Sequence, residues 1–240
     1  MIAPALVGQK NSLKQLAERV AIAAQNGQIP KYVAVEGPIG VGKTTLVKRL
    51  AELFGYPTML EPVKENPFLD RFYADGASQA LPTQLFFLLY RTRQLGDLPK
   101  DDLLEPCMVA DFLLEKDELF AKLTLDAEEL ALYQQIQATL KLNPPKPDLV
   151  LYLQAPASVL RQRITGRGLS FEQDIDLDYL TELSNRYAEF FHYYEDSPLL
   201  IVNAADIDFA NNDDHFAALV DRVINMDGTR QFFNPNPTLI

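Results

Sequence analysis

Short apolar runs rich in β-branched residues alternate along the chain with longer segments in which apolar residues recur at helical spacing. Continuous apolar runs are typical of parallel strands that helices cover on both faces. On this basis we predict five buried strands, at residues 32–36, 57–60, 106–110, 149–154 and 199–202. The alternation of strands and helices indicates an α/β fold built on a five-stranded parallel sheet that helices flank.

The helical segments carry their own start signals. Ser12 with Gln15, and Asp126 with Glu129, have the capping-box spacing that opens a helix. The tail, at about residues 228–240, contains two prolines and is expected to be irregular. Further helices are predicted at residues 43–54, 82–96, 177–194 and 216–223.

Composition and charge narrow the class of protein. The chain has 240 residues, 48% of them hydrophobic and 23% charged, which fits a single globular domain over residues 1–240. Its net charge of −11 argues against nucleic acid or an anionic membrane as a partner, because either would repel it. The single cysteine excludes an intrachain disulfide, and we find neither a signal peptide nor a membrane-spanning run. We therefore expect a cytoplasmic protein.

The strongest chemical signal is GPIGVGKT at residues 37–44, which matches G-x-x-x-x-G-K-[ST] between a predicted strand and a predicted helix. Glycines let the backbone turn so that its N–H groups point at phosphate oxygens, and the following helix adds the positive end of its dipole. Lys43 would reach the β- and γ-phosphates of ATP, and the Thr44 hydroxyl would bind Mg²⁺. The residues predicted to bind the nucleotide are Gly37, Pro38, Ile39, Gly40, Val41, Gly42, Lys43, Thr44 and Thr45.

Among P-loop proteins, the rest of the chain favours a kinase for a small alcohol. The third predicted strand is not followed by the D-x-x-G motif of a switch GTPase, and the N-K-x-D motif for guanine is also missing. Glu61 ends the second predicted strand, and ligands of parallel sheets lie beyond the carboxyl ends of the strands. We therefore expect Glu61 to stand beside the phosphate loop and to accept a proton from a hydroxyl group.

Two pairs of polar residues at helical spacing add to this interpretation. Arg163 and Arg167 are four residues apart, so both guanidinium groups lie on one helix face. They indicate a short lid, at about residues 161–175, that brings positive charge to the transferring phosphoryl group. Gln84 and Arg91 lie two turns apart on an otherwise apolar helix, where polar side chains are either paired or face a ligand.

Together these residues resemble the deoxyribonucleoside kinase family. The stretches that carry the resemblance occur in the family's order: EGPIGVGKTT, EPVKENPFLDRFY, LPTQLFFLLYRTRQL, DFLLEKDELFA and RQRITGRGLSFEQDIDLDYL. The EPV-x-x-N-P-F-L and lid segments are similar to the bacterial purine-preferring branch. The resemblance implies a P-loop fold, a homodimer, and Mg²⁺-dependent transfer of the γ-phosphoryl group of ATP to the 5′-hydroxyl of a deoxyribonucleoside.

The resemblance also implies a catalytic set. Glu61 matches the family's general base for the 5′-hydroxyl, and Lys43 is the lysine of the phosphate loop. Arg163 and Arg167 match the first two arginines of the lid. A third lid arginine of the family is replaced here by Leu169.

On the nucleoside side, the resemblance implies five contacts. Tyr73 and Glu172 match residues that bind the 3′-hydroxyl. Gln84 matches the amide that reads the edge of the base, and Arg91 matches an arginine on the opposite side of the base. Phe120 matches a phenylalanine that stacks on the base.

The chain departs from the family after the third strand, where E-R-S or D-R-S is usual. If strand ends are aligned, Asp111 takes the acidic position, which would hold Mg²⁺ through water, and Phe112 replaces the arginine. If downstream residues are aligned instead, Ala110 takes the acidic position and Asp111 that of the arginine. We prefer the first alignment, because a Mg²⁺ site requires a carboxylate there. In either case an arginine that helps to position Glu61 is missing, and Lys116 falls where a base-reading carboxylate often lies.

Two alternatives to a deoxynucleoside kinase remain at this point. A kinase for another small acceptor, such as a nucleoside monophosphate, would need extra basic groups, which Arg71, Arg91 and Arg93 could supply. The missing arginine at Phe112 instead favours a catalytically weak, nucleotide-binding accessory subunit.

Overall fold

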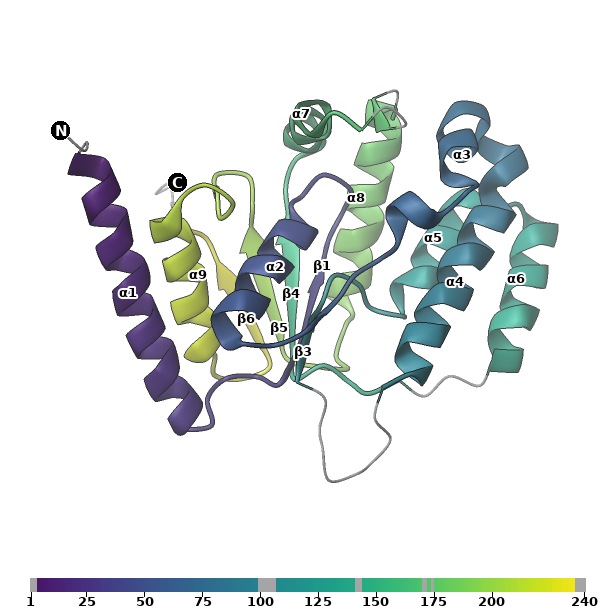
Figure 1. The fold of residues 1–240 in the computed structure, drawn as a ribbon. Coiled ribbons are helices and arrows are strands. Elements are labelled where there is room, and N and C mark those ends of the chain that lie inside the picture. The colour runs from purple at the N-terminus through teal and green to yellow at the C-terminus, as the bar shows by residue number, and fades with distance from the viewer. Residues whose placement is uncertain (1–3, 99–106, 141–143, 170–171, 174, 236–240) are drawn as a thin grey trace.

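The computed structural model describes residues 4–98, 107–140, 144–169, 172–173 and 175–235. Within these residues, six strands form one parallel sheet in the order β2-β3-β1-β4-β5-β6 (Figure 1). The strands are β1 (Tyr32–Glu36), β2 (Thr58–Met59), β3 (Met108–Ala110), β4 (Leu149–Gln154), β5 (Leu199–Asn203) and β6 (Arg230–Phe233).

The five strands expected from the apolar runs are all present, and the α/β fold with a parallel sheet is confirmed. The prediction of an irregular tail is wrong at residues 230–233, where β6 adds a sixth strand beside β5. This strand has no apolar run, because it lies at the sheet edge and none of its four side chains is buried. Arg230 also ties it to the end of a helix, donating hydrogen bonds to the carbonyls of Phe191 and Tyr194 at 3.0 and 2.7 Å.

The predicted helices are present within a few residues of their expected bounds, except at the N-terminal end, whereas the helices at Leu69–Asp75 and Lys116–Thr124 were not predicted. The first helix begins at Pro4 rather than at Ser12, so the capping pattern at Ser12 lies inside it. Proline is well suited to a first helical position, because the N–H that it lacks has no partner there. The helices are α1 (Pro4–Gln25), α2 (Lys43–Phe54), α3 (Leu69–Asp75), α4 (Ala80–Gly96), α5 (Lys116–Thr124), α6 (Ala127–Leu140), α7 (Ala157–Arg167), α8 (Leu177–His192) and α9 (Asp213–Ile224), with 3₁₀ turns at Val63–Glu65 and Gly76–Gln79.

Helices cover the sheet on both faces, which explains why the strands read as continuous apolar runs (Figure 1). Val35 and Leu151 belong to a core that includes residues of α1, α2 and α9. The opposite face of the sheet packs against α4, α5 and α8, and there Tyr152 stacks on Phe191 with ring centroids 4.2 Å apart. Among the described helices, none has the length and hydropathy that a membrane crossing requires.

The strand order brings three chain segments to one place. The carboxyl ends of β2, β3 and β1 are neighbours in the sheet, because β3 pairs with both of the other strands. Glu61 follows β2, Asp111 follows β3, and the phosphate loop follows β1. The order also changes direction at β1, which has β3 on one side and β4 on the other, and ligands of open α/β sheets bind at such points.

The capping residue Asp126 at the start of α6 should contribute measurably to the stability of the protein. The Asp126 carboxylate accepts hydrogen bonds from the N–H groups of Glu128 and Glu129, both at 2.9 Å. We expect Asp126→Ala to lower the free energy of unfolding by about 1 kcal/mol, since two helix N–H groups lose their acceptor. Urea denaturation followed by circular dichroism measures this change. Glu128→Ala, an exposed carboxylate in the same turn, is the control and should change stability less.

Candidate active site

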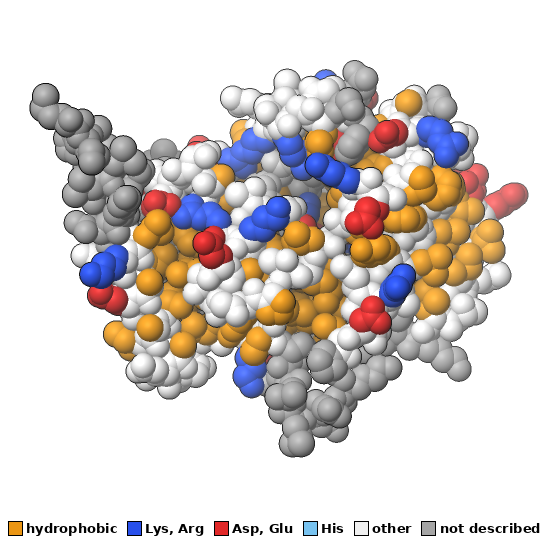
Figure 2. Space-filling view, in the orientation of Figure 1, with side chains coloured by type: hydrophobic (Ala, Val, Ile, Leu, Met, Phe, Trp, Pro, Cys, Tyr) orange, Lys and Arg blue, Asp and Glu red, His pale blue; other side chains and the backbone are white. Residues whose placement is uncertain are grey.

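A cavity of about 1130 Å³ lies at the carboxyl ends of the strands. Its wall combines the phosphate loop, the segment after β2, and residues of α4, α5, α7 and α8. Figure 2 shows Lys and Arg side chains gathered beneath α7, where this face of the molecule is hollowed. Single ligand pockets commonly have volumes of about 300–1,000 Å³, so the cavity is large enough for two substrates to meet.

The phosphate loop has the backbone that its motif predicts. Gly40 has a φ of 82°, and a Cβ there would lie 2.7 Å from Ile164 Cγ1 and 2.9 Å from the Leu160 carbonyl oxygen, so a side chain is excluded on two grounds. Lys43 Nζ folds over the loop and donates to the carbonyl oxygens of Gly37 and Pro38, at 2.7 and 3.3 Å. The predicted nucleotide-binding residues Ile39, Gly40, Val41, Gly42, Lys43, Thr44 and Thr45 line the cavity.

Asp111 joins the phosphate loop to the segment after β2. The Thr44 hydroxyl donates to Asp111 Oδ2 at 2.8 Å, and the Glu61 N–H donates to Asp111 Oδ1 at 2.8 Å. Burial and the nearby charge of Glu61 raise the pKa of Asp111. These contacts support the alignment in which Asp111, not Ala110, takes the acidic position.

The donors at this point fit Mg²⁺. Among the described residues, no group of three or more His, Cys, Asp or Glu side chains could hold a metal ion alone. A hydroxyl and one carboxylate beside a phosphate-binding loop suit Mg²⁺, because this ion takes oxygen ligands and completes its shell with phosphate and water. Thr44 and Asp111 are therefore the residues that would hold it.

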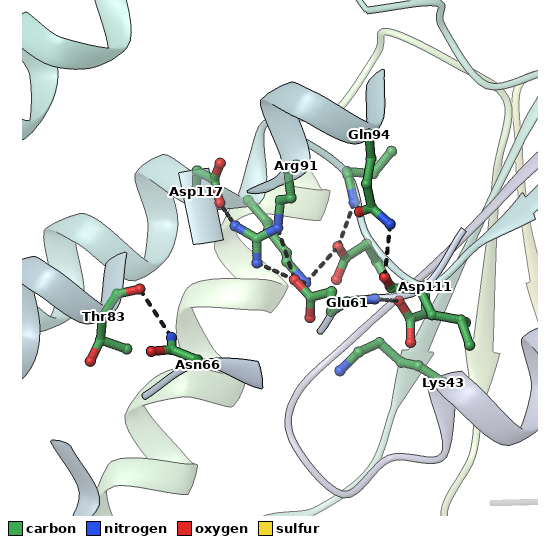
Figure 3. Close-up of polar contacts among 12 residues, drawn as sticks. Lys43, Glu61, Asn66, Thr83, Arg91, Gln94, Asp111 and Asp117 are labelled. Carbon is green, nitrogen blue, oxygen red and sulfur yellow. Dashed lines mark hydrogen bonds and ion pairs between the residues drawn. The ribbon is translucent and has the colours of Figure 1, made fainter. Parts of the chain in front are cut away.

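Glu61 is held by two cations (Figure 3). Arg91 Nε donates to Glu61 Oε1 at 2.8 Å, and Lys116 Nζ lies 2.9 Å from the same oxygen. The described residues donate no hydrogen bond to Oε2. Burial opposes ionisation of Glu61, but the charges of Arg91 and Lys116 outweigh it and lower its pKa to about 2. The carboxylate is thus ionised at neutral pH, with one oxygen anchored and the other available to an acceptor.

Lys116 and Asp117 complete a buried charge network that the motifs did not reveal. Arg91 also pairs with Asp117, whose side chain is 1% exposed, and Lys116 Nζ lies 3.4 Å from Glu36 Oε1. Asp117 is therefore a second acidic partner of Arg91, and it follows Lys116, which falls where a base-reading carboxylate of the family often lies. A signal existed in the sequence, because Lys116 stands three residues before the buried Leu119 and so falls on the buried face of α5.

The residues expected to bind the nucleoside line the same cavity. Tyr73, Gln84, Phe120 and Glu172 all contribute to its wall. The Gln84 amide nitrogen donates to the Thr124 hydroxyl at 3.3 Å, which fixes the orientation of the amide. Burial raises the pKa of Tyr73 well above its ordinary value, so its hydroxyl stays protonated and can donate a hydrogen bond. The assigned roles of these four residues remain predictions.

The two lid arginines have protein partners in the structure. Arg163 donates to the carbonyl oxygens of Val41 and Ala204, at 3.3 and 2.7 Å, and so joins α7 to the phosphate loop. Arg167 forms an ion pair with Glu172. Part of the predicted lid, at residues 170, 171 and 174, lies outside the described residues, so the lid itself stays a prediction.

The arginines that would favour a nucleoside monophosphate as acceptor are not gathered in the cavity. Arg71 and Arg93 are exposed side chains that do not belong to its wall. Arg91 lines the cavity, but it is already paired with Glu61 and Asp117. The structure therefore does not provide these three arginines as a site for an acceptor phosphate.

Comparisons with known proteins agree with this geometry. The family model for deoxynucleoside kinases matches residues 33–226. A deoxyguanosine kinase of Bacillus subtilis is 38% identical over 158 residues, which are 65% of this chain and 76% of that enzyme. A deoxyadenosine/deoxycytidine kinase of the same organism is 29% identical over 82% of this chain and 94% of its own length. The structure of a deoxyadenosine kinase from M. mycoides with bound dATP superposes with a TM-score of 0.68 at 26% identity, covering 80% of this chain and 99% of that one.

The phosphate loop gives a direct binding prediction. Lys43→Ala should weaken MgATP binding by roughly 10–100-fold, the equivalent of one charge-assisted hydrogen bond at about 1.5–3 kcal/mol. Titration calorimetry with MgATP measures the change in Kd. Lys48→Ala removes an exposed lysine from the same helix and should bind as the wild type does. Equal affinities in the two variants would contradict the role of Lys43.

Proposed function

The chain belongs to the deoxynucleoside kinase family, and from this premise we propose that it transfers the γ-phosphoryl group of ATP to the 5′-hydroxyl of a deoxyribonucleoside, with purine nucleosides preferred. The main observation behind the proposal is the position of the ionised Glu61. The Glu61 N–H and the Thr44 hydroxyl of the phosphate loop both donate hydrogen bonds to Asp111, which holds the two segments side by side. The similar deoxyguanosine and deoxyadenosine/deoxycytidine kinases of Bacillus subtilis support the acceptor class.

The reaction needs a base at the acceptor. A 5′-hydroxyl is a weak nucleophile at neutral pH, and a placed carboxylate can take its proton as the new O–P bond forms. Glu61 suits this role because Arg91 and Lys116 both bind Oε1, which leaves Oε2 to accept the proton. The same two cations keep the carboxylate ionised, so it is ready to act at neutral pH.

The reaction also needs positive charge on the phosphates. Lys43 lies on the phosphate loop, and Arg163 and Arg167 line the cavity from α7. In phosphoryl transfer such groups neutralise charge that spreads over the transferring group. Mg²⁺ held by Thr44 and Asp111 would supply further neutralisation of the phosphate oxygens. Arg167 can serve the phosphates only by leaving or sharing its partner Glu172.

The deoxynucleoside would occupy the part of the cavity lined by α4, α5 and the lid. We assign Gln84 to the base edge, Arg91 to the opposite side of the base, Phe120 to stacking, and Tyr73 with Glu172 to the 3′-hydroxyl. These assignments are supported by the place of the residues, since both Gln84 and Tyr73 line the cavity and carry polar groups that can hydrogen-bond a nucleoside.

A panel of acceptors tests the proposed function. The wild-type protein is incubated with ATP, Mg²⁺ and each of the four common deoxynucleosides, the matching ribonucleosides and their monophosphates. We expect deoxynucleoside 5′-monophosphates, formed fastest from deoxyguanosine or deoxyadenosine. Transfer only to monophosphates, or to no acceptor while MgATP still binds, would contradict the proposal.

Glu61→Gln separates the base from the rest of the site. The variant keeps the shape of the side chain but cannot accept the proton, so kcat and kcat/KM should fall together by about 10²–10⁴-fold. The KM for the deoxynucleoside should change little. Because the pKa of Glu61 is about 2, the ratio of wild-type to variant rates should be the same at pH 6 and pH 8.

Glu52→Gln is the control, since it removes an exposed carboxylate of α2 that does not line the cavity. We expect this variant to retain most of the wild-type kcat. If Glu61→Gln behaves like Glu52→Gln in steady-state kinetics, the base lies elsewhere, and Asp111 is the next candidate.

We also propose that the protein is a homodimer that uses α4 and α6. These two helices pack together at one end of the molecule (Figure 1). Leu89 of α4 and Leu132 of α6 are 51% and 47% exposed, and a second subunit packed on this face would remove both side chains from water.

The dimer prediction is tested by charge placed on this face. Leu89→Glu with Leu132→Glu should shift the protein from dimer to monomer in analytical ultracentrifugation, because burying two new carboxylates at an interface is costly. Ile22→Glu changes an equally exposed apolar residue on α1 and should leave the mass unchanged. A wild-type protein that sediments as a monomer would contradict the proposal directly.

A further inference from the structure

The arginine expected after Asp111 is replaced by Phe112, and the structure shows where this side chain lies. Phe112 is 1% exposed and belongs to the apolar core between the sheet and α4, α5 and α8. The Arg91 guanidinium carbon lies 5.7 Å from the centroid of the Phe112 ring and 5.1 Å from that of Phe87. Phe112 therefore gives Arg91 an aromatic contact, but it supplies no charge to Glu61.

We propose that Lys116 takes over the lost function and is a positioning residue that holds Glu61 for the reaction, an inference that rests on the proposed function. Lys116 opens α5 and comes from a different element than the residue it replaces. Its Nζ lies 2.9 Å from Glu61 Oε1, within the range of a direct charge-assisted hydrogen bond.

The burial of Lys116 indicates that its contact with Glu61 is more than a chance surface ion pair. The side chain of Lys116 is 3% exposed, and a buried ammonium group is tolerated only where carboxylates compensate for lost water. Its two carboxylates are Glu61 and Glu36, with Glu36 Oε1 at 3.4 Å. A lysine serving only the packing of α5 would gain nothing from this place, because an apolar side chain could fill it without the cost of desolvation.

Glu36 gives Lys116 a rigid support. This carboxylate is fully buried and accepts hydrogen bonds from the N–H groups of Gly37 and Leu113, at 3.1 and 2.7 Å. The Tyr187 hydroxyl donates to it as well, at 3.1 Å. Lys116 thus connects Glu61 to a group fixed at the entry of the phosphate loop, so the distance between base and phosphates is set by the fold.

Lys116 and Arg91 together restrict the orientation of the Glu61 carboxylate. Arg91 approaches Oε1 from α4 and Lys116 approaches it from α5, so the carboxylate is held from two elements. With one of them missing, Glu61 could rotate about its side-chain bonds and turn Oε2 away from the acceptor. A displacement of about 1 Å of a reacting group can lower the rate on the order of 10²-fold.

A double-mutant cycle tests whether Lys116 acts through Glu61. Lys116→Met should lower kcat by roughly 10²-fold with little change in the deoxynucleoside KM. In the Glu61→Gln background the same substitution should have almost no further effect, because the base that Lys116 positions is already gone. Lys116→Arg, which keeps the charge, should restore a large part of kcat.

The controls separate positioning from folding. Lys122→Met removes an exposed lysine of the same helix, paired with Glu118 on the surface, and should keep the wild-type kcat. If Lys116→Met fails to fold, Lys116→Gln combined with Glu36→Gln avoids a buried unpaired carboxylate at Glu36, and this variant should still lose kcat. Circular dichroism and MgATP affinity verify that each variant is folded.

Several results would overturn the inference. An equal loss in the wild-type and Glu61→Gln backgrounds, full kcat in the Lys116→Gln/Glu36→Gln variant, or no rescue by arginine would each exclude a positioning role. These results differ from a failure of the proposed function. In that case the wild-type protein itself transfers no phosphoryl group to any deoxynucleoside, and the inference falls with it.

Discussion

The site depends on one largely buried carboxylate, Glu61, and on the cations that keep it charged. Glu61 would be neutral in an apolar cavity, because burial favours the protonated acid. Its pKa instead falls to about 2, since Arg91 and Lys116 outweigh burial. The surrounding network holds four carboxylates and three cations, namely Glu36, Glu61, Asp111 and Asp117 with Lys43, Arg91 and Lys116. Removing one partner from such a network leaves a buried charge uncompensated.

The sheet explains why these charges meet. The carboxyl ends of β2, β3 and β1 are adjacent, so Glu61, Asp111 and the phosphate loop need no long connections to come together. Helices α4 and α5 then supply Arg91 and Lys116 from the side. Arg163 and Arg167 are also held by protein atoms, Arg163 by backbone carbonyls and Arg167 by Glu172.

Much of this could be read from the sequence, and the exceptions have physical causes. The strand runs, the phosphate loop and Glu61 are local patterns, and the structure places them as predicted. The strand β6 was not predicted, because an edge strand with no buried side chain has no apolar run. The buried ion pairs of Lys116 and Asp117 were not predicted, because charged residues at the start of a helix are normally solvated and the partners of these two lie far away in the sequence. Ion pairs of this kind depend on how the strands and helices are arranged, and a short stretch of sequence does not show that arrangement.

The role of Glu61 is tested most directly by a distance in a crystal structure of the protein with a bound deoxynucleoside. We predict that the 5′-oxygen lies within about 2.6–3.2 Å of Glu61 Oε2. Oε1 should at the same time keep its contacts with Arg91 and Lys116. An acceptor oxygen bound to Oε1, or a Glu61 side chain that has left both cations, would contradict this role.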